Sequence, residues 1–112
     1  MKEIKAFIRP ICLDKVLHAF HEHPEFPGVT VLKVRGMGRV VERDSDSGDS
    51  VAFGAVEMIK LECLVRDDQC DEVVAVIQER AKTGRPGDGN ISVQTLDNVI
   101  RIRTGETGAN AV

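Results

Sequence analysis

A glycine-rich segment with two basic side chains, residues 82–90 (KTGRPGDGN), carries the clearest chemical signature in the sequence. Glycine reaches backbone conformations that are closed to other residues and lets main-chain N–H groups approach an anion closely. Lys82 and Arg85 add positive charge, so the segment is suited to holding the phosphate group of a nucleotide. The alternative is an ordinary tight turn, which a Gly-Pro-Gly composition also favours.

Arg101 and Arg103 form a second candidate anion site. Alternation along an extended backbone would place both guanidinium groups on the same side of the chain. Guanidinium binds phosphate oxygens in bidentate fashion, so such a pair suits a polyphosphate. The alternative is a solvated edge strand whose positive charges prevent further strand pairing.

A third cluster, Gly36, Met37, Gly38 and Arg39, lies before a polar segment. It lacks the third glycine of a dinucleotide-binding fingerprint, and the segment around Gly87 lacks the Gly-Lys-Ser/Thr of a P-loop. Neither standard phosphate motif is therefore present.

Three histidines, His18, His21 and His23, occur close together at the end of a predicted helix. Imidazoles at this spacing are candidate ligands of a transition metal. The alternative is the polar side of a surface helix. Because the histidines are distant in sequence from the glycine-rich segments, and no serine or cysteine lies in a nucleophile motif, we expect no catalytic site and no enzyme activity.

The hydrophobic pattern predicts four strands, two helices and a short tail strand. The first strand alternates over residues 2–8, and the first helix repeats apolar residues from position 13 to 20. A long exposed loop is predicted at residues 41–50, and Asp67 is predicted to cap the second helix. The order βαββαβ predicts an α+β, ferredoxin-like sandwich with an antiparallel sheet, both helices on one face, and a short C-terminal strand. The remaining predicted segments are strands from residue 29 toward 39, at 58–65 and at 91–93, a helix containing 73–77, and the tail at 99–102.

The composition favours a single globular domain over residues 1–112, with 42% hydrophobic residues, 29% charged residues and a net charge of −3. This acidic balance and the absence of Trp and Tyr argue against nucleic-acid binding. No apolar run approaches the roughly 20 residues that cross a bilayer, so we expect no direct membrane insertion. Cys12, Cys63 and Cys70 are odd in number and lack CxxC spacing, which favours reduced thiols and a cytoplasmic location.

Four motifs together resemble those of the PII-type nitrogen-regulatory signal-transduction proteins, in the order and spacing of that family. They are residues 2–10 (KEIKAFIRP), 36–39 (GMGR), 83–89 (TGRPGDG) and 99–106 (VIRIRTGE). The resemblance covers nearly the whole chain and is that of a divergent, PII-like member.

The resemblance implies a homotrimer of ferredoxin-like subunits that binds an adenine nucleotide, ADP, AMP or ATP, in each cleft between subunits. It also implies a long T-loop, residues 39–55, that contacts target proteins. By position, the implied nucleotide contacts are Thr30, Glu62 and Leu64 near the adenine, Gly36, Met37, Gly38 and Arg39 at the base of the T-loop, Gly87, Asp88, Gly89 and Asn90 at the phosphates, and Arg101 and Arg103 from the neighbouring subunit.

The sequence departs from the family pattern at three positions. Val40 stands where the family has a glutamine that it uses with Mg²⁺ and 2-oxoglutarate, so the usual sensing of 2-oxoglutarate is not expected, and the use of Mg²⁺ is left open. Met58 and Asn90 stand where the family usually has lysines, which points to ADP, AMP or weak ATP binding. The T-loop has no tyrosine for uridylylation.

The sequence therefore predicts a nucleotide-sensing regulator whose T-loop controls a target protein. The target classes are an enzyme or membrane transporter of nitrogen or carbon metabolism, or a metal-efflux system. The alternative is a metal-binding ferredoxin-like trimer of the divalent-cation-tolerance type, with His18, His21 and His23 as ligands.

Overall fold

The structure, a computed structural model, describes the backbone of residues 1–44 and 48–112 and the side chains of residues 1–37 and 55–112. The side chain of Arg39, predicted at the base of the T-loop, therefore lies outside the described residues. Neither helix in the described ranges has the length and apolar content needed to cross a membrane.

Four strands form a single antiparallel sheet in the order β2-β3-β1-β4. β1 lies in the interior, with Ile4 opposite Cys63 of β3 on one side and opposite Val93 of β4 on the other. The four predicted strands of the sheet are confirmed. Their bounds are β1 Lys2–Ile8, β2 Thr30–Asp44, β3 Gly48–Val65 and β4 Gly89–Thr95.

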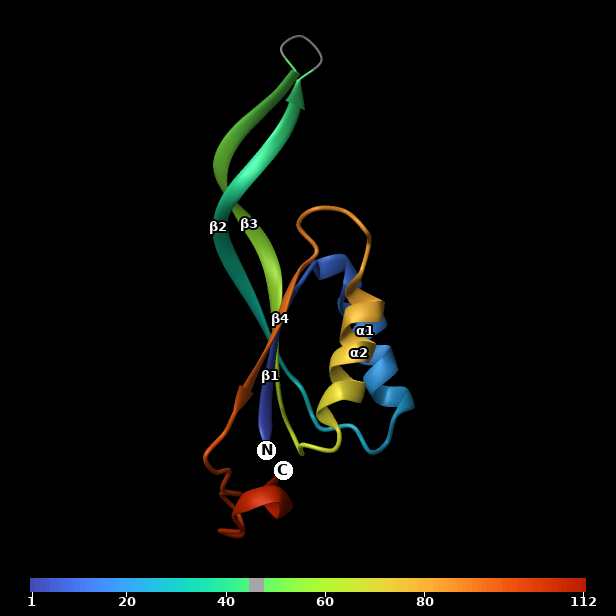
Figure 1. Ribbon diagram of the computed structural model, residues 1–112, viewed down its shortest axis with the longest axis vertical. Helices are drawn as coiled ribbons and strands as arrows, with labels where there is room; N and C mark the ends of the chain where they lie inside the picture. Colours follow the sequence, from blue (N-terminus) through green and yellow to red (C-terminus); the bar gives the residue numbers. More distant parts are fainter. Residues whose placement is uncertain (45–47) are drawn as a thin grey trace.

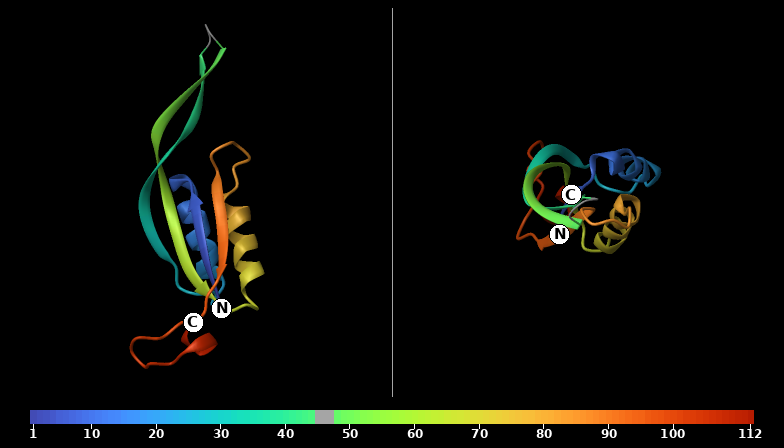
Figure 2. Two further views of the ribbon diagram at one scale, coloured as in Figure 1. Left: turned by 60° about the vertical axis from the view of Figure 1, so that its left-hand side comes forward. Right: turned by 90° about the horizontal axis from the view of Figure 1, so that it is seen from above.

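Both long helices cover the same face of the sheet, and among residues 1–44 and 48–112 no helix covers the other face (Figure 2). The predicted ferredoxin-like βαββαβ architecture is thus confirmed. The helical segments are η1 Pro10–Cys12, α1 Leu13–Glu22, α2 Cys70–Ala81 and η2 Gly108–Ala111.

The core lies between this sheet face and the helices. In β1 the alternate residues Ile4, Ala6 and Ile8 are buried, while α1 contributes Val16 and Phe20 at helical spacing. α2 adds Val73 and Ile77 in the same way. Cys12, Cys63 and Cys70 are free and buried, and burial raises the pKa of the Cys63 thiol to about 11.

The predicted loop at residues 41–50 is largely extended and paired, which corrects the sequence prediction. β2 and β3 form a long hairpin that projects beyond the helices, with Arg43 opposite Asp49 and Asp44 opposite Gly48 (Figure 1). Backbone hydrogen bonds continue the register set in the buried part of the hairpin, so this pairing needs no apolar alternation. Residues 45–47 lie outside the described chain.

The predicted cap of α2 is also wrong. The helix begins at Cys70, and Gln69 occupies the N-cap, where its side chain makes no capping hydrogen bond to the helix. Asp67 instead accepts a 2.6 Å hydrogen bond from the N-terminal ammonium, which lowers the pKa of the Asp67 carboxyl. A charge-assisted bond of this kind is stronger than one to a neutral amide.

The chain after β4 does not form the predicted C-terminal strand. Ile100 makes only an isolated antiparallel bridge with Thr107. Gly105 N donates to Arg101 O at 2.8 Å, and Arg101 N donates to Glu106 O at 2.9 Å, so the segment between them is a closed turn. Gly105 has a φ of 74°, a conformation that glycine allows and that ends the extended pattern.

Candidate functional site

The glycine-rich loop connects α2 to the edge strand β4, and its glycines are required by the backbone. Gly84, Gly87 and Gly89 have φ values of 85°, 94° and 100°. At Gly89 a Cβ would lie 1.8 Å from the carbonyl oxygen of Phe7, and at Gly87 it would lie 3.2 Å from Nη2 of Arg9. Any other residue at position 89 would therefore force β1 and β4 apart.

The Asp88 carboxylate organises this loop from within. Oδ2 accepts hydrogen bonds from the amides of Thr83 and Gly84, both at 2.9 Å, and Oδ1 accepts from the Thr83 hydroxyl. These bonds hold the pKa of Asp88 well below its usual range, with the Thr83 hydroxyl the largest cause and Arg9 the next. Asp88, predicted among the phosphate contacts, thus has its carboxylate turned into its own loop.

Arg9 fastens the loop to the end of β1. Its Nε donates to Asp88 Oδ1 at 2.9 Å, and its Nη2 donates to the carbonyl oxygen of Pro86 at 2.7 Å. Both side chains of the ion pair are about three-quarters buried. Sequence analysis did not select Arg9 or Thr83 as individual site residues, and the only signal was the charge on Arg9 at the end of a predicted strand.

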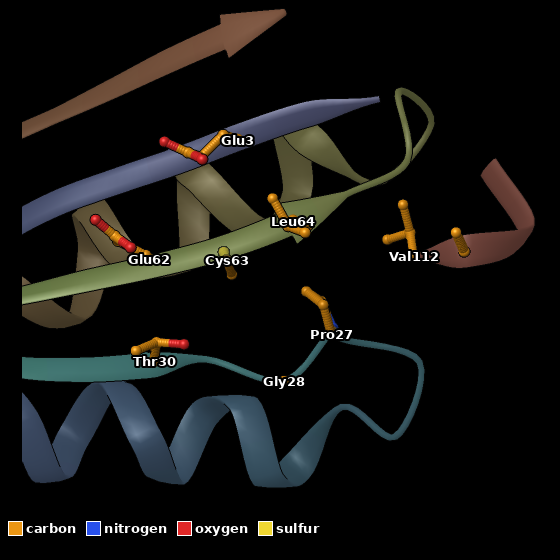
Figure 3. Close-up of a pocket in the computed structure, with 9 residues that line it drawn as sticks. Glu3, Pro27, Gly28, Thr30, Glu62, Cys63, Leu64 and Val112 are labelled. Atoms are coloured by element: carbon orange, nitrogen blue, oxygen red, sulfur yellow. The ribbon is translucent and has the colours of Figure 1, made fainter. Parts of the chain in front are cut away.

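A hollow of about 430 Å³ contains Thr30, Glu62 and Leu64, the three residues predicted near the adenine (Figure 3). Thr30 and Glu62 are direct partners in the β2–β3 register. The hollow is bounded by β1, β3, the start of β2 and the end of the chain; its other lining residues are Glu3, Pro27, Gly28, Cys63, Ala111 and Val112.

This hollow is acidic. Figure 3 shows the Glu3 and Glu62 side chains on neighbouring strands at its wall. Lys60 Nζ lies 2.8 Å from the Glu62 carboxylate, and this hydrogen bond is the main reason why the pKa of Glu62 is lowered. Lys5 Nζ also lies 3.9 Å from the Glu3 carboxylate, so both glutamates are paired with lysines. Their remaining oxygen lone pairs can accept hydrogen bonds from an amino group or the donor edge of a base. The hollow is therefore suited to the base of a nucleotide.

A second hollow, of about 320 Å³, lies between α2 and the edge of β4. It contains Asp88, Gly89 and Asn90, three of the four residues predicted at the phosphates. Most of its remaining lining is apolar: Phe7, Ile8, Val74, Ala81 and Ile91. Gln78 and Lys82 complete the lining.

Arg101 and Arg103 lie in a turn and not on an extended backbone. The prediction that strand alternation places their side chains on the same side is therefore wrong. Arg101 opens the turn closed by Gly105, and its guanidinium lies 4.0 Å from Glu106. Arg103 is exposed.

The turn at residues 101–105 is called here the arginine turn. It and the glycine-rich loop are at opposite ends of β4 (Figure 1). The 7 residues of β4 separate them, a length of about 20 Å at the usual strand rise. One chain by itself therefore cannot bring both groups to the same phosphate tail.

Gly36 and Met37 are exposed on β2, where Gly36 is opposite Val56 and Met37 is opposite Ala55. Gly38 and Arg39 continue the strand opposite Gly54 and Phe53. The cluster thus lies within the projecting hairpin rather than in a loop.

The three predicted metal-binding histidines are not brought together in the described part of the chain. His18 Nε2 lies 2.7 Å from Glu22, on the same helix. His23 forms a separate group with Glu25 and Glu72.

A family model described as "Nitrogen regulatory protein P-II" matches residues 1–106. The chain belongs to the P-II family. Among curated P-II proteins it is 38% identical to the one from Rhizobium meliloti, over the whole of both chains. It is 42% identical to P-II 2 from Methanothermobacter thermautotrophicus, covering all of this chain and 97% of that protein. The family and its relatives are named as regulators, and this P-II chain is a regulator rather than an enzyme.

The fold also matches solved structures of B. subtilis GlnK. One of these structures has a TM-score of 0.80 at 28% identity, covering 99% of this chain and 97% of GlnK. A second structure, a GlnK–ATP complex, has a TM-score of 0.80 at 28% identity and covers 99% of this chain and 96% of GlnK.

Proposed function

We propose that this P-II protein binds an adenine nucleotide and uses the β2–β3 hairpin to control a target protein. The observation that carries the proposal is the match to a solved GlnK–ATP complex. This chain also has two separate features that suit the two ends of a nucleotide, an acidic hollow and a glycine-rich loop.

The adenine occupies the hollow at Thr30, Glu62 and Leu64, where carboxylate oxygens can accept hydrogen bonds from its amino group. The phosphates lie at the glycine-rich loop, where Gly87 and Gly89 allow close approach of the main chain. Asp88 and Arg9 hold the shape of this loop.

Arg101 and Arg103 complete the phosphate site from a neighbouring subunit in a homotrimer. Two observations support this arrangement. Within one chain the arginine turn and the glycine-rich loop are separated by the length of β4. The strand register places Leu32 opposite Lys60 and Leu64 opposite Glu3, on the sheet face away from the helices. These leucines are 41% and 37% exposed, and exposed apolar side chains on an uncovered sheet face are suited to a subunit interface.

The phosphate site has fewer positive charges than is usual in the family, which favours ADP or AMP over ATP. The Met58 side chain reaches the phosphate end of β4, where its Cε lies 3.3 Å from the position of a Cβ on Gly89. Asn90 follows Gly89 directly. Neither side chain supplies a cation to neutralise a third phosphate.

The hairpin is the output element. A nucleotide shifts the hairpin between two arrangements only to the extent that it binds one of them more tightly. The target is an enzyme or a membrane transporter that recognises one arrangement.

Isothermal titration calorimetry with ADP, AMP, ATP and GTP tests the proposal. We expect saturable binding of adenylates with ADP or AMP at least as tight as ATP, and no binding of GTP at the same concentration. Absence of adenylate binding by the folded protein would overturn the proposal.

A further inference from the structure

Three side chains with metal-binding atoms meet where the end of α1 approaches the start of α2. His23 follows α1, Glu25 lies two residues further on, and Glu72 is in the first turn of α2. One ligand atom from each lies within 4.8 Å of the other two. We propose that this cluster, called here the His23 site, binds a divalent transition-metal ion such as Zn²⁺.

The donor set fits such an ion. Imidazole nitrogen and carboxylate oxygen are both ligand types that Zn²⁺ accepts, and three such ligands would leave a fourth position open. Ligand atoms on a tetrahedral zinc ion are about 3.4 Å apart when the metal–ligand distance is near 2.1 Å. The cluster therefore needs only rotamer adjustments of the two glutamates to close on an ion.

The ring of His23 and the backbone of Glu25 are held in place without a metal. The His23 ring stacks on Phe26, with 4.5 Å between ring centroids and 15° between the planes. Phe26 is buried in the core, and its amide donates to His23 O at 2.9 Å. Gln69 Nε2 donates to the carbonyl oxygen of Glu25 at 2.6 Å, which ties this segment to the residue before α2.

The charge balance also favours a cation. Within the described ranges, neither Glu25 nor Glu72 has an ion pair with a lysine or an arginine, and Glu25 faces only His23, at 3.6 Å. The neighbouring basic residues are already paired, Arg66 with Asp68 and Arg80 with Glu22. Two carboxylates outnumber the single imidazole, so the cluster carries a net negative charge that a divalent ion neutralises.

The His23 site is separate from the proposed nucleotide site, although Pro27 and Gly28 of the acidic hollow follow it in the chain. An ion bound there joins α1, the segment before β2, and α2. Because the ion binds the folded chain, it raises the melting temperature once the free ion concentration exceeds its dissociation constant.

Calorimetric titration of the full chain with ZnCl₂, in a buffer without chelators, tests the inference. We expect one ion per chain, and affinity reduced by about tenfold or more in His23→Ala and in Glu72→Gln. His21→Ala is the matched control, because His21 is an exposed histidine on α1 outside the cluster, and it should bind Zn²⁺ as the wild type does.

A thermal melt provides the second readout. At one Zn²⁺ concentration, the melting temperature should rise equally in the wild type and in His21→Ala, and should rise less in His23→Ala. Wild-type affinity in His23→Ala, an equal loss in His21→Ala, or no Zn²⁺ binding by the wild type would each overturn the inference. None of these results depends on nucleotide binding, so the proposed function is tested separately.

Discussion

Asp88 is the residue on which the shape of the glycine-rich loop depends. Its carboxylate accepts the amides of Thr83 and Gly84 and is paired with Arg9. The loop therefore presents a fixed backbone to a ligand, and Asp88 acts by positioning that backbone rather than by touching phosphate.

We predict that Asp88→Asn weakens ADP binding by about tenfold or more, because an amide cannot accept all of these bonds and leaves loop donors unpaired. Asp97→Asn, an exposed change beyond β4, should leave the affinity unchanged. Calorimetry on both variants measures the difference. Equal affinities would show that the loop keeps its shape without the carboxylate.

The same carboxylate gives a prediction for pH. Because the pKa of Asp88 is lowered in the folded protein, its contribution to stability is fully present above the unfolded value of about 3.9 and is lost as pH falls toward the folded value. Carboxyl ¹³C NMR should therefore show Asp88 still ionised at pH 4, and Arg9→Ala should raise its midpoint. Titration of wild-type Asp88 near pH 3.9 would contradict the hydrogen bonding described here.

At the scale of elements, we expect that the end of the hairpin can be removed without loss of nucleotide binding. The register places Val41 opposite Val51, so a two-residue Asn-Gly turn can replace residues 42–50 and close a shorter hairpin. We predict that this variant folds and keeps its ADP affinity but no longer controls a target. Calorimetry and circular dichroism test the first part, and loss of nucleotide binding would place the removed segment in the site itself.

The elements themselves were largely predictable from sequence, because burial imposes a period on the residues. Ile4, Ala6 and Ile8 alternate and are buried in β1, while Val16 and Phe20 follow the helical repeat in α1. These patterns were sufficient for the order of elements and the ferredoxin-like architecture.

The errors fell where burial imposes no period. The backbone pairing of the hairpin continues through a polar stretch, and Asp67 binds the N-terminal ammonium, 66 positions away in sequence. The arginine turn was missed because the pattern of Arg101 and Arg103 suggested extension, whereas Gly105, with positive φ, closes a turn. The role of Arg9 depends on a contact across 79 positions, which local sequence does not encode.

At the scale of the whole molecule, the two halves of the proposed phosphate site require more than one chain. We predict a trimer in sedimentation velocity. Leu32→Glu, which places a charge on the sheet face without helices, should dissociate it while the isolated chains remain folded by circular dichroism. A wild-type monomer, or an unchanged trimer in the variant, would contradict this interface.

The central claim is that Arg103 of one subunit holds the phosphates bound by the glycine-rich loop of another. Calorimetric titration of ADP into Arg103→Ala, with Arg80→Ala as a control on the helical face, tests it most directly. We predict a loss of about 1.5 to 3 kcal/mol for Arg103→Ala, the scale of a lost hydrogen bond to a charged group. Arg80→Ala should match the wild type, since Arg80 pairs with Glu22 on α1. Wild-type ADP affinity in Arg103→Ala would contradict the account.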